Sequence, residues 1–250
     1  MHTTFTDLLI AASLAAATGA LGPLVFGRRA PPALVALGWS NALAAGMMLG
    51  AAYLVMTAGL ELAGLAAVGG ALLGVGLTWG AHALYGIGGG EMSPLTPAHD
   101  REAGDGRRRA GLVATAAVHS APEGLAIGAA WALDAGFGLF VAATLAVHNV
   151  WEGAVLGARL MPNGTTRPRA ALLAVAANVT QPLLAVLTVL LVSALPGALP
   201  WTLGAAFGAL VYLCMGELLP ESYGAAGRTS IAVVVSVAAG VVALLGGRMR

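Results

Sequence analysis

The feature that most constrains this chain is a series of long apolar segments, separated by short stretches with charges, prolines and glycine clusters. About 20 consecutive apolar residues are enough for a helix to cross the hydrocarbon core of a bilayer. Eight such segments result, near 7–26, 34–57, 62–86, 110–133, 137–160, 169–195, 199–220 and 229–247. The sequence therefore predicts an all-α integral membrane protein with eight transmembrane helices.

The composition excludes several other classes of protein. With 58% hydrophobic and only 9% charged residues, the chain cannot cover a soluble fold with a polar surface. Its formal net charge is +1 and every basic residue is an arginine, so a polybasic surface for nucleic acid is not expected. The single cysteine, Cys214, excludes a disulfide framework and a multi-cysteine metal site.

The arginines are distributed unevenly along the chain, and cytoplasmic loops retain more Arg and Lys than external ones. Ten of the 12 basic residues lie after the first, third or seventh segment or around the end of the fifth: Arg28, Arg29, Arg101, Arg107, Arg108, Arg109, Arg159, Arg167, Arg169 and Arg228. We therefore expect both termini to be external. The chain forms a single transmembrane domain, 1–250, with a flexible cytoplasmic loop at 88–109 that is rich in Gly, Pro and mixed charge.

Two segments carry the same motif, H-x-x-x-E-G-x-x-x-G, 29 residues apart. The first copy contains His119 and Glu123, and the second contains His148 and Glu152. Residues four apart share one face of a helix. Measured from the connection at Asp134, all four side chains lie about 16–27 Å from that turn, near the middle of the bilayer.

Ionisable side chains are costly in hydrocarbon and usually mark a functional site, so this layer of two imidazoles and two carboxylates predicts a metal site. The alternative is a pair of buried His–Glu hydrogen bonds that lock a helical hairpin. The sixth segment adds Asn178 and Gln181, and Pro182 cannot donate a hydrogen bond to the carbonyl of Asn178. Mixed nitrogen and oxygen ligands suit Zn, Fe(II), Mn or Cd better than Mg or Ca.

These motifs resemble those of the ZIP metal transporters, whose fourth helix carries H-N-x-P-E-G and whose fifth carries a similar H/Q-N/D-x-P-E-G. The sequence from Glu217 to Glu221, ELLPE, resembles the family's H-E-L-L-P-E. The resemblance implies a ZIP-like bundle of eight helices that works by alternating access. It also implies that the transport site contains His119, Ser120, Glu123, His148, Asn149, Glu152 and Gln181.

The chain also departs from the family pattern. Ser120 stands where the family usually has Asn, Trp151 where it has Pro, Gln181 where it has a metal-binding Glu, and Gly216 where it often has His. With only two site carboxylates left, the site neutralises one divalent ion rather than two. We therefore expect one metal ion at a time.

The expected function is transport of a divalent transition-metal ion towards the cytoplasm, with zinc favoured and iron, manganese or cadmium as alternatives. The metal is a substrate, and neither a prosthetic group nor an enzymatic activity is expected. The partners are metal ions and the lipid bilayer, without nucleic acid, and the sequence leaves a homodimer open. The Ala-, Gly- and Arg-rich composition indicates a bacterial cytoplasmic (inner) membrane.

Two other functions stay open at this stage. A metal sensor or scaffold that binds without transport is suggested by Trp151, Gln181 and Gly216. An intramembrane metal hydrolase would also use His and Glu around zinc, although the chain has no H-E-x-x-H motif.

A few further ionisable residues have lesser expected roles. His82 is expected to bond a neighbour or to line the ion's route. Glu217 is expected to be interfacial or to pass the ion to the cytoplasm. Glu61 is interpreted as a solvated charge, and His99 lies in the expected loop.

Overall fold

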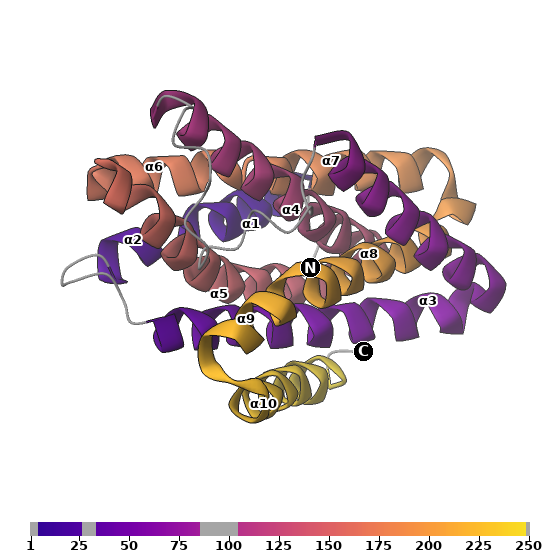
Figure 1. Ribbon diagram of the computed structural model, residues 1–250. Coiled ribbons are helices and arrows are strands. Elements are labelled where there is room, and N and C mark those ends of the chain that lie inside the picture. Colours follow the sequence, from indigo (N-terminus) through magenta and orange to yellow (C-terminus); the bar gives the residue numbers. More distant parts are fainter. Residues whose placement is uncertain (1–4, 27–33, 86–104, 249–250) are drawn as a thin grey trace.

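The computed structural model describes residues 5–26, 34–85 and 105–248, and every regular element within these ranges is a helix. Most of the predicted loop at 88–109 lies outside the described residues, as do Arg28, Arg29 and His99. The helices lie side by side along roughly one direction and form an elongated bundle (Figure 1). Their bounds are α1 (Phe5–Thr18), α2 (Leu21–Phe26), α3 (Leu34–Tyr85), α4 (Asp105–Leu133), α5 (Ala135–Leu160), α6 (Arg167–Ala177), α7 (Thr180–Ala194), α8 (Leu199–Leu213), α9 (Leu219–Ala226) and α10 (Arg228–Gly246).

Six helical stretches in the described residues are long and apolar enough to cross a membrane. They are Phe5–Leu24, Leu34–Leu84, Ala135–Leu160, Arg167–Ala194, Pro196–Ala226 and Arg228–Gly246. Large apolar side chains cover much of the outer surface, and Leu65 and Leu84 are 92% and 86% exposed. Such a surface is stable in contact with lipid chains rather than water. The protein is therefore an all-helical integral membrane protein.

Helix α3 contains 52 residues and interrupts its helical geometry at Ala63, where φ is −160° and ψ is 93°. A straight helix of that length would extend about 78 Å, more than twice the thickness of the hydrocarbon core. Figure 1 shows the chain reversing direction at the right-hand end of this helix. The kink lies close to the gap predicted between the segments 34–57 and 62–86.

Helix α4 begins earlier than predicted. The apolar segment was expected from residue 110, but the helix starts at Asp105, so the last residues of the predicted loop at 88–109 are helical. Apolarity marks where a helix meets lipid, whereas a charged turn can continue the same helix into water. The prediction of a loop up to Arg109 is therefore wrong for residues 105–109.

Three of the predicted continuous segments contain breaks. The first divides into α1 and α2, the sixth divides into α6 and α7 at Asn178, and a π-helical turn, Cys214–Leu218, separates α8 from α9. The expectation that Pro182 leaves the carbonyl of Asn178 without a partner is wrong, because the backbone N–H of Gln181 donates to it at 3.1 Å. The chain closes a tighter turn that does not need the N–H that proline lacks.

Small residues, including glycine pairs four positions apart, bring the helices into close contact. A β-carbon on Gly204 would lie 2.0 Å from the carbonyl oxygen of Ala67, and one on Gly208 would lie 2.0 Å from that of Ala71. Gly70 and Gly74 make the reciprocal approach from α3 to α8. The second half of α3 is thus packed directly on the backbone of α8.

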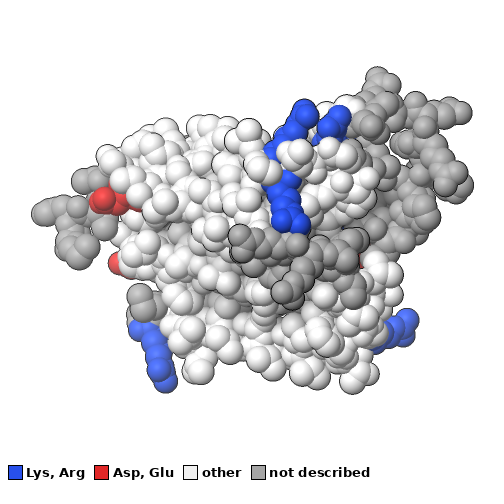
Figure 2. Space-filling model, turned by 90° about the vertical axis from the view of Figure 1, so that its left-hand side faces the viewer, with Lys and Arg blue, Asp and Glu red and all other residues white. Residues whose placement is uncertain are grey.

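The left-hand end of the bundle in Figure 1 is where α2 and α5 end and where α3, α4, α6 and α10 begin. Figure 2 views the molecule from this side and shows several basic side chains, but few acidic ones, on a surface that is otherwise uncharged. We call this the arginine-bearing end. It provides a reference direction for the site described next.

Candidate metal centre

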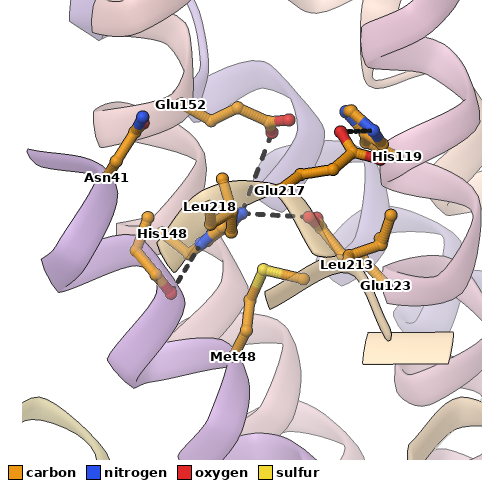
Figure 3. A pocket seen from close by; sticks show the side chains of 10 residues that line it. Asn41, Met48, His119, Glu123, His148, Glu152, Leu213, Glu217 and Leu218 are labelled. Atoms are coloured by element: carbon orange, nitrogen blue, oxygen red, sulfur yellow. Dashed lines mark hydrogen bonds and ion pairs between the residues drawn. The ribbon is translucent and has the colours of Figure 1, made fainter. Parts of the chain in front are cut away.

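Helices α4 and α5 bring Glu123, His148 and Glu152 together inside the bundle. His148 Nε2 lies 3.0 Å from Glu123 Oε1 and 3.8 Å from Glu152 Oε2 (Figure 3). One potential ligand atom from each of the three residues lies within 4.8 Å of the others. We call these three residues the central cluster. The side chains of Glu123 and His148 are only 1% and 2% exposed.

The backbone orients the imidazole of His148. Its Nδ1 donates to the carbonyl oxygen of Ala44 in α3 at 3.2 Å, because a carbonyl can only accept. Nε2 is thereby directed at the two carboxylates. Metal-binding histidines are typically held in this way, with one ring nitrogen on a backbone carbonyl and the other on the ion.

The amide of Gln181 contacts Glu123, and the amide of Asn149 in turn holds Gln181. Gln181 contacts the second carboxylate oxygen of Glu123 through Nε2 and also donates to Asn149 Oδ1 at 3.1 Å. Asn149 donates to Gln181 Oε1 at 3.0 Å and to the carbonyl of Ala15 at 2.8 Å. These two predicted ligands therefore lie next to the central cluster and orient its carboxylate.

The glycines of the repeated motif explain how distant helices reach this cluster. A β-carbon on Gly124 would lie 2.4 Å from the carbonyl oxygen of Gln181 in α7, and one on Gly153 would lie 2.0 Å from that of Gly19. Only glycine permits both approaches. The motif thus combines two metal-binding residue types with the close helix packing that places Gln181 beside Glu123.

His119 does not join the central cluster. Its Nε2 lies 2.7 Å from Glu217 Oε2, and the same carboxylate contacts His82 Nε2. Four residues of helix separate His119 from Glu123 by about 6 Å along the axis. Because they share a helix face, His119 and Glu123 line the same cavity, but they do not bind at the same position within it.

Two other predicted ligands, Ser120 and Asn178, donate to backbone carbonyls near the ends of α6 and α1 instead of facing the cluster. Ser120 Oγ donates to the carbonyl of Ala177 at 2.9 Å and lies 2.6 Å from Thr180 Oγ1. Asn178 Nδ2 donates to the carbonyl of Ala16 at 3.4 Å. Both side chains are buried and satisfy backbone groups that the broken helices expose.

His119, Glu123, His148, Glu152 and Glu217 line a single cavity of about 30 Å³. Its remaining lining consists of Asn41, Ala44, Met48, Leu213 and Leu218. Such a volume accommodates about two water-sized bodies, or an ion with a water molecule. The cavity is therefore of a size suited to a bare or nearly bare ion rather than to an organic substrate.

At the rim of this cavity an ion pair connects three helices. Arg159 Nη2 lies 3.0 Å from Glu221 Oε2, which also accepts from Asn41 Nδ2 at 3.0 Å. Arg159 is one residue before the end of α5, at the arginine-bearing end. Glu221 thus joins α3, α5 and α9 between the cavity and that end of the molecule.

Sequence reasoning undervalued His82 and Glu217. His82 is the only Asp, Glu, His, Lys or Arg residue of the segment 62–86, and Glu217 belongs to the ELLPE sequence rather than to the repeated motif, so no spacing connected either of them with His119. The available signal was that both are ionisable residues in apolar segments, which are usually functional inside a membrane. Their meeting depends on the reversal of α3 and on its packing against α8.

Comparison with known proteins bears on what this site is for. The family model described as ZIP zinc transporter matches residues 97–247, more than half of this chain of 250 residues. The chain belongs to the ZIP zinc transporter family. The matched region contains the central cluster, His119 and Glu217, and this membership confirms the predicted resemblance to a family of membrane metal transporters, which are not enzymes.

One curated relative is named zinc transporter GufA, from Myxococcus xanthus, and is 39% identical over 107 residues. The matched region covers 42% of this chain and 42% of that relative. The chain therefore aligns with less than half of the relative's length. Zinc transport, which the name of the relative states, is therefore proposed for this chain below.

Proposed function

We propose that this ZIP-family protein carries divalent transition-metal ions across a bacterial cytoplasmic membrane, towards the cytoplasm. Zinc is the favoured substrate, and Fe(II), Mn and Cd fit the same ligands. The curated relative GufA, named as a zinc transporter, supports the choice of zinc. Nitrogen and oxygen ligands together suit zinc and its neighbours better than magnesium or calcium.

The observation that carries the proposal is the buried central cluster of Glu123, His148 and Glu152. Two carboxylates neutralise one divalent ion, and an imidazole adds a nitrogen ligand without adding charge. In a buried site of low dielectric, that balance of charge favours a bound ion over an empty pair of like charges. The central cluster therefore holds one ion at a time.

The proposed topology has eight spans and external termini. The break at Ala63 divides the longest of the six apolar stretches in two, and α4 adds a further span of 29 residues. The arginine-bearing end is then cytoplasmic. In this arrangement the rim pair of Arg159 and Glu221 lies on the cytoplasmic side of the cavity, at the ion's exit.

A labelling experiment tests this orientation. In intact cells, a membrane-impermeant maleimide should fail to label Arg108→Cys and should label it after the membrane is opened. The native Cys214 is fully buried and should give little background labelling. The Cys214→Ala protein measures how much of the signal comes from Cys214. Labelling of Arg108→Cys from outside would overturn the proposed orientation.

Uptake by proteoliposomes tests the function itself. Purified protein should move zinc into vesicles loaded with a fluorescent zinc indicator. This uptake should stop when the zinc gradient is removed. A sensor or scaffold would bind zinc in the same preparation without moving it, and this outcome would overturn the proposal. Parallel measurements with Fe(II), Mn and Cd rank the substrates.

A further inference from the structure

A large apolar groove lies on the side of α4 opposite the metal cavity. Its volume is about 390 Å³, and its walls come from the second half of α3 and from α4, α7 and α8, which meet in the right-hand half of Figure 1. Ala121 and Leu125 line the groove, whereas His119 and Glu123 line the metal cavity. At 3.6 residues per turn, these two pairs lie on roughly opposite sides of the helix. The groove is therefore separate from the metal cavity.

The walls of the groove carry no charge. All of the described residues that line it are Gly, Ala, Val, Leu, Pro or Thr. The hydroxyls of the two threonines already have partners, because Thr78 donates to the carbonyl of Gly74 at 2.8 Å and Thr180 donates to that of Ala117 at 2.8 Å. The walls thus offer an occupant apolar contacts and few hydrogen bonds, so the groove is poorly suited to water.

The groove opens onto the lipid-facing surface of the bundle. Leu77 lines its edge and is 64% exposed, and Leu73, one turn earlier in α3, is exposed beside it. On α7, Leu183 and Leu187 are exposed next to the lining residue Leu184. These leucines belong to the apolar outer surface that contacts acyl chains. An occupant of the groove therefore enters from the lipid rather than from water.

Glycine contacts hold the helices on each side of the groove. A β-carbon on Gly74 would lie 2.1 Å from the carbonyl oxygen of Ala205, so α3 lies directly against α8. A β-carbon on Gly128 would lie 2.5 Å from the carbonyl oxygen of Ala185, so α4 lies directly against α7. The groove runs between these two closely packed pairs of helices.

Small side chains leave the space between the two pairs unfilled. About half of the lining residues are glycine or alanine, namely Gly74, Ala81, Ala117, Ala121, Ala205 and Ala209. Protein interiors are close-packed, and the walls of an unfilled space lose dispersion contacts. An apolar occupant restores those contacts without requiring any hydrogen bond.

We propose that this groove binds one acyl chain of a phospholipid from the surrounding bilayer. Its volume of about 390 Å³ falls within the range of about 300–1,000 Å³ that is typical of sites for small molecules. Acyl chains are the apolar groups present at the mouth of the groove, and a flexible chain can enter between α3 and α7. The headgroup stays at the membrane interface, so the uncharged walls have no charge to satisfy.

The bound chain packs behind the metal-binding residues. Pro122 and Thr180 line the groove, and each directly precedes a residue of the metal centre, Glu123 or Gln181. Glu123 and Gln181 contact each other across α4 and α7. A chain in the groove therefore supports the two helices that form this contact. The existence of the lipid site does not depend on the proposed transport function.

Native mass spectrometry tests the inference by counting bound phospholipid. Purified full-length protein in detergent, supplied with phosphatidylethanolamine, should retain one phospholipid per chain under conditions that remove the others. Ala81→Phe places a bulky ring in the groove and should lose this phospholipid. Val237→Phe adds the same ring to the exposed face of α10 and is the matched control, which should keep it. Retention by Ala81→Phe, or no retained phospholipid in the unmodified protein, would overturn the inference.

Thermal unfolding measures the same binding independently. A ligand that binds only the folded protein raises its Tm. Phosphatidylethanolamine added to the delipidated protein should raise the Tm of the unmodified protein and of Val237→Phe by about 3 °C, and should leave that of Ala81→Phe almost unchanged. An equal rise in all three proteins would show that lipid acts through the general outer surface and would contradict a site in the groove.

Photolabelling of the unmodified protein does not depend on any variant being stable. In proteoliposomes, a phospholipid with a diazirine near the end of one acyl chain should label residues 117–125 of α4. None of these residues is exposed on the outer surface, so their labelling reports on the groove. Labelling confined to exposed residues would overturn the site. Labelling of 117–125 by a diazirine fatty acid but not by the phospholipid would overturn the assigned source of the chain.

Discussion

The central cluster and a neighbouring group of His82, His119 and Glu217, which we call the outer cluster, consist of similar residues but differ in charge and burial. The central cluster has two carboxylates and one imidazole, and Glu123 and His148 are almost fully buried whereas Glu152 is 20% exposed. The outer cluster reverses the ratio, with two imidazoles and one carboxylate, and two of its members are about one-fifth exposed. The central cluster therefore has one more carboxylate than the outer cluster, and two buried members where the outer cluster has one.

This difference indicates how one cavity could both hold an ion and release it. Electrostatic attraction in a buried site is several times stronger than in a solvated one, so a second carboxylate matters most where water is excluded. A neutral, partly solvated imidazole contributes a ligand but little charge. Capture is thus expected at the central cluster and release at the outer cluster.

The largest expected effect comes from removing charge at the central cluster. Glu123→Ala and Glu152→Ala should each abolish zinc uptake into proteoliposomes, because a divalent ion would keep an uncompensated charge in a low-dielectric environment. Glu61→Ala is the matched control, since Glu61 is exposed at the turn of α3 and should retain uptake. Normal uptake of zinc, iron, manganese and cadmium by Glu152→Ala would remove the central cluster from the mechanism.

A smaller effect is expected at the outer cluster. Glu217→Gln should lower the maximum rate of zinc uptake about tenfold, equivalent to about 1.4 kcal/mol, because the ion loses its charged partner on leaving. Zinc binding to the central cluster should persist. Initial rates over a range of zinc concentrations, with a calorimetric titration of the same protein, measure both quantities. Complete loss of binding would show that the clusters are not separate sites.

Gln181→Glu should sharpen the comparison by adding charge beside the central cluster. The new carboxylate would lie against Glu123, which Gln181 now contacts through its amide. The two carboxylates repel each other when no ion is bound, and a bound zinc ion relieves that repulsion. Zinc should therefore bind several-fold more tightly and leave more slowly. Stopped-flow exchange with a chelator measures the zinc affinity and the dissociation rate of both proteins. Unchanged affinity would mean that a charge at position 181 does not interact with the bound ion.

The smallest effect is expected for Ser120→Ala. Ser120 bonds Ala177 and Thr180 at the break between α6 and α7, so its loss should lower the free energy of unfolding by about 1 kcal/mol. Zinc affinity should change little. Thermal unfolding with and without zinc separates the two effects. A large loss of affinity without a change in stability would support the prediction that Ser120 is a ligand.

The apolar segments predicted the helices closely, because the requirement to cross a bilayer is written into composition over about 20 residues. The repeated H-x-x-x-E motif also led to Glu123, His148 and Glu152, since residues four apart stay neighbours on one helix. Periodicity did not predict that His119 turns towards Glu217. That contact depends on which helical segment packs opposite α4 across the cavity, here the turn after α8.

The sequence by itself determined that the chain is an α-helical membrane protein and that imidazoles and carboxylates lie deep within it. Only the tertiary structure decided how those groups are shared between two clusters. Helical spacing is a local property, but His82, His119 and Glu217 meet because α3 reverses at Ala63 and packs on α8 through glycine. Contacts between residues far apart in the chain follow from helix packing, which no single segment encodes.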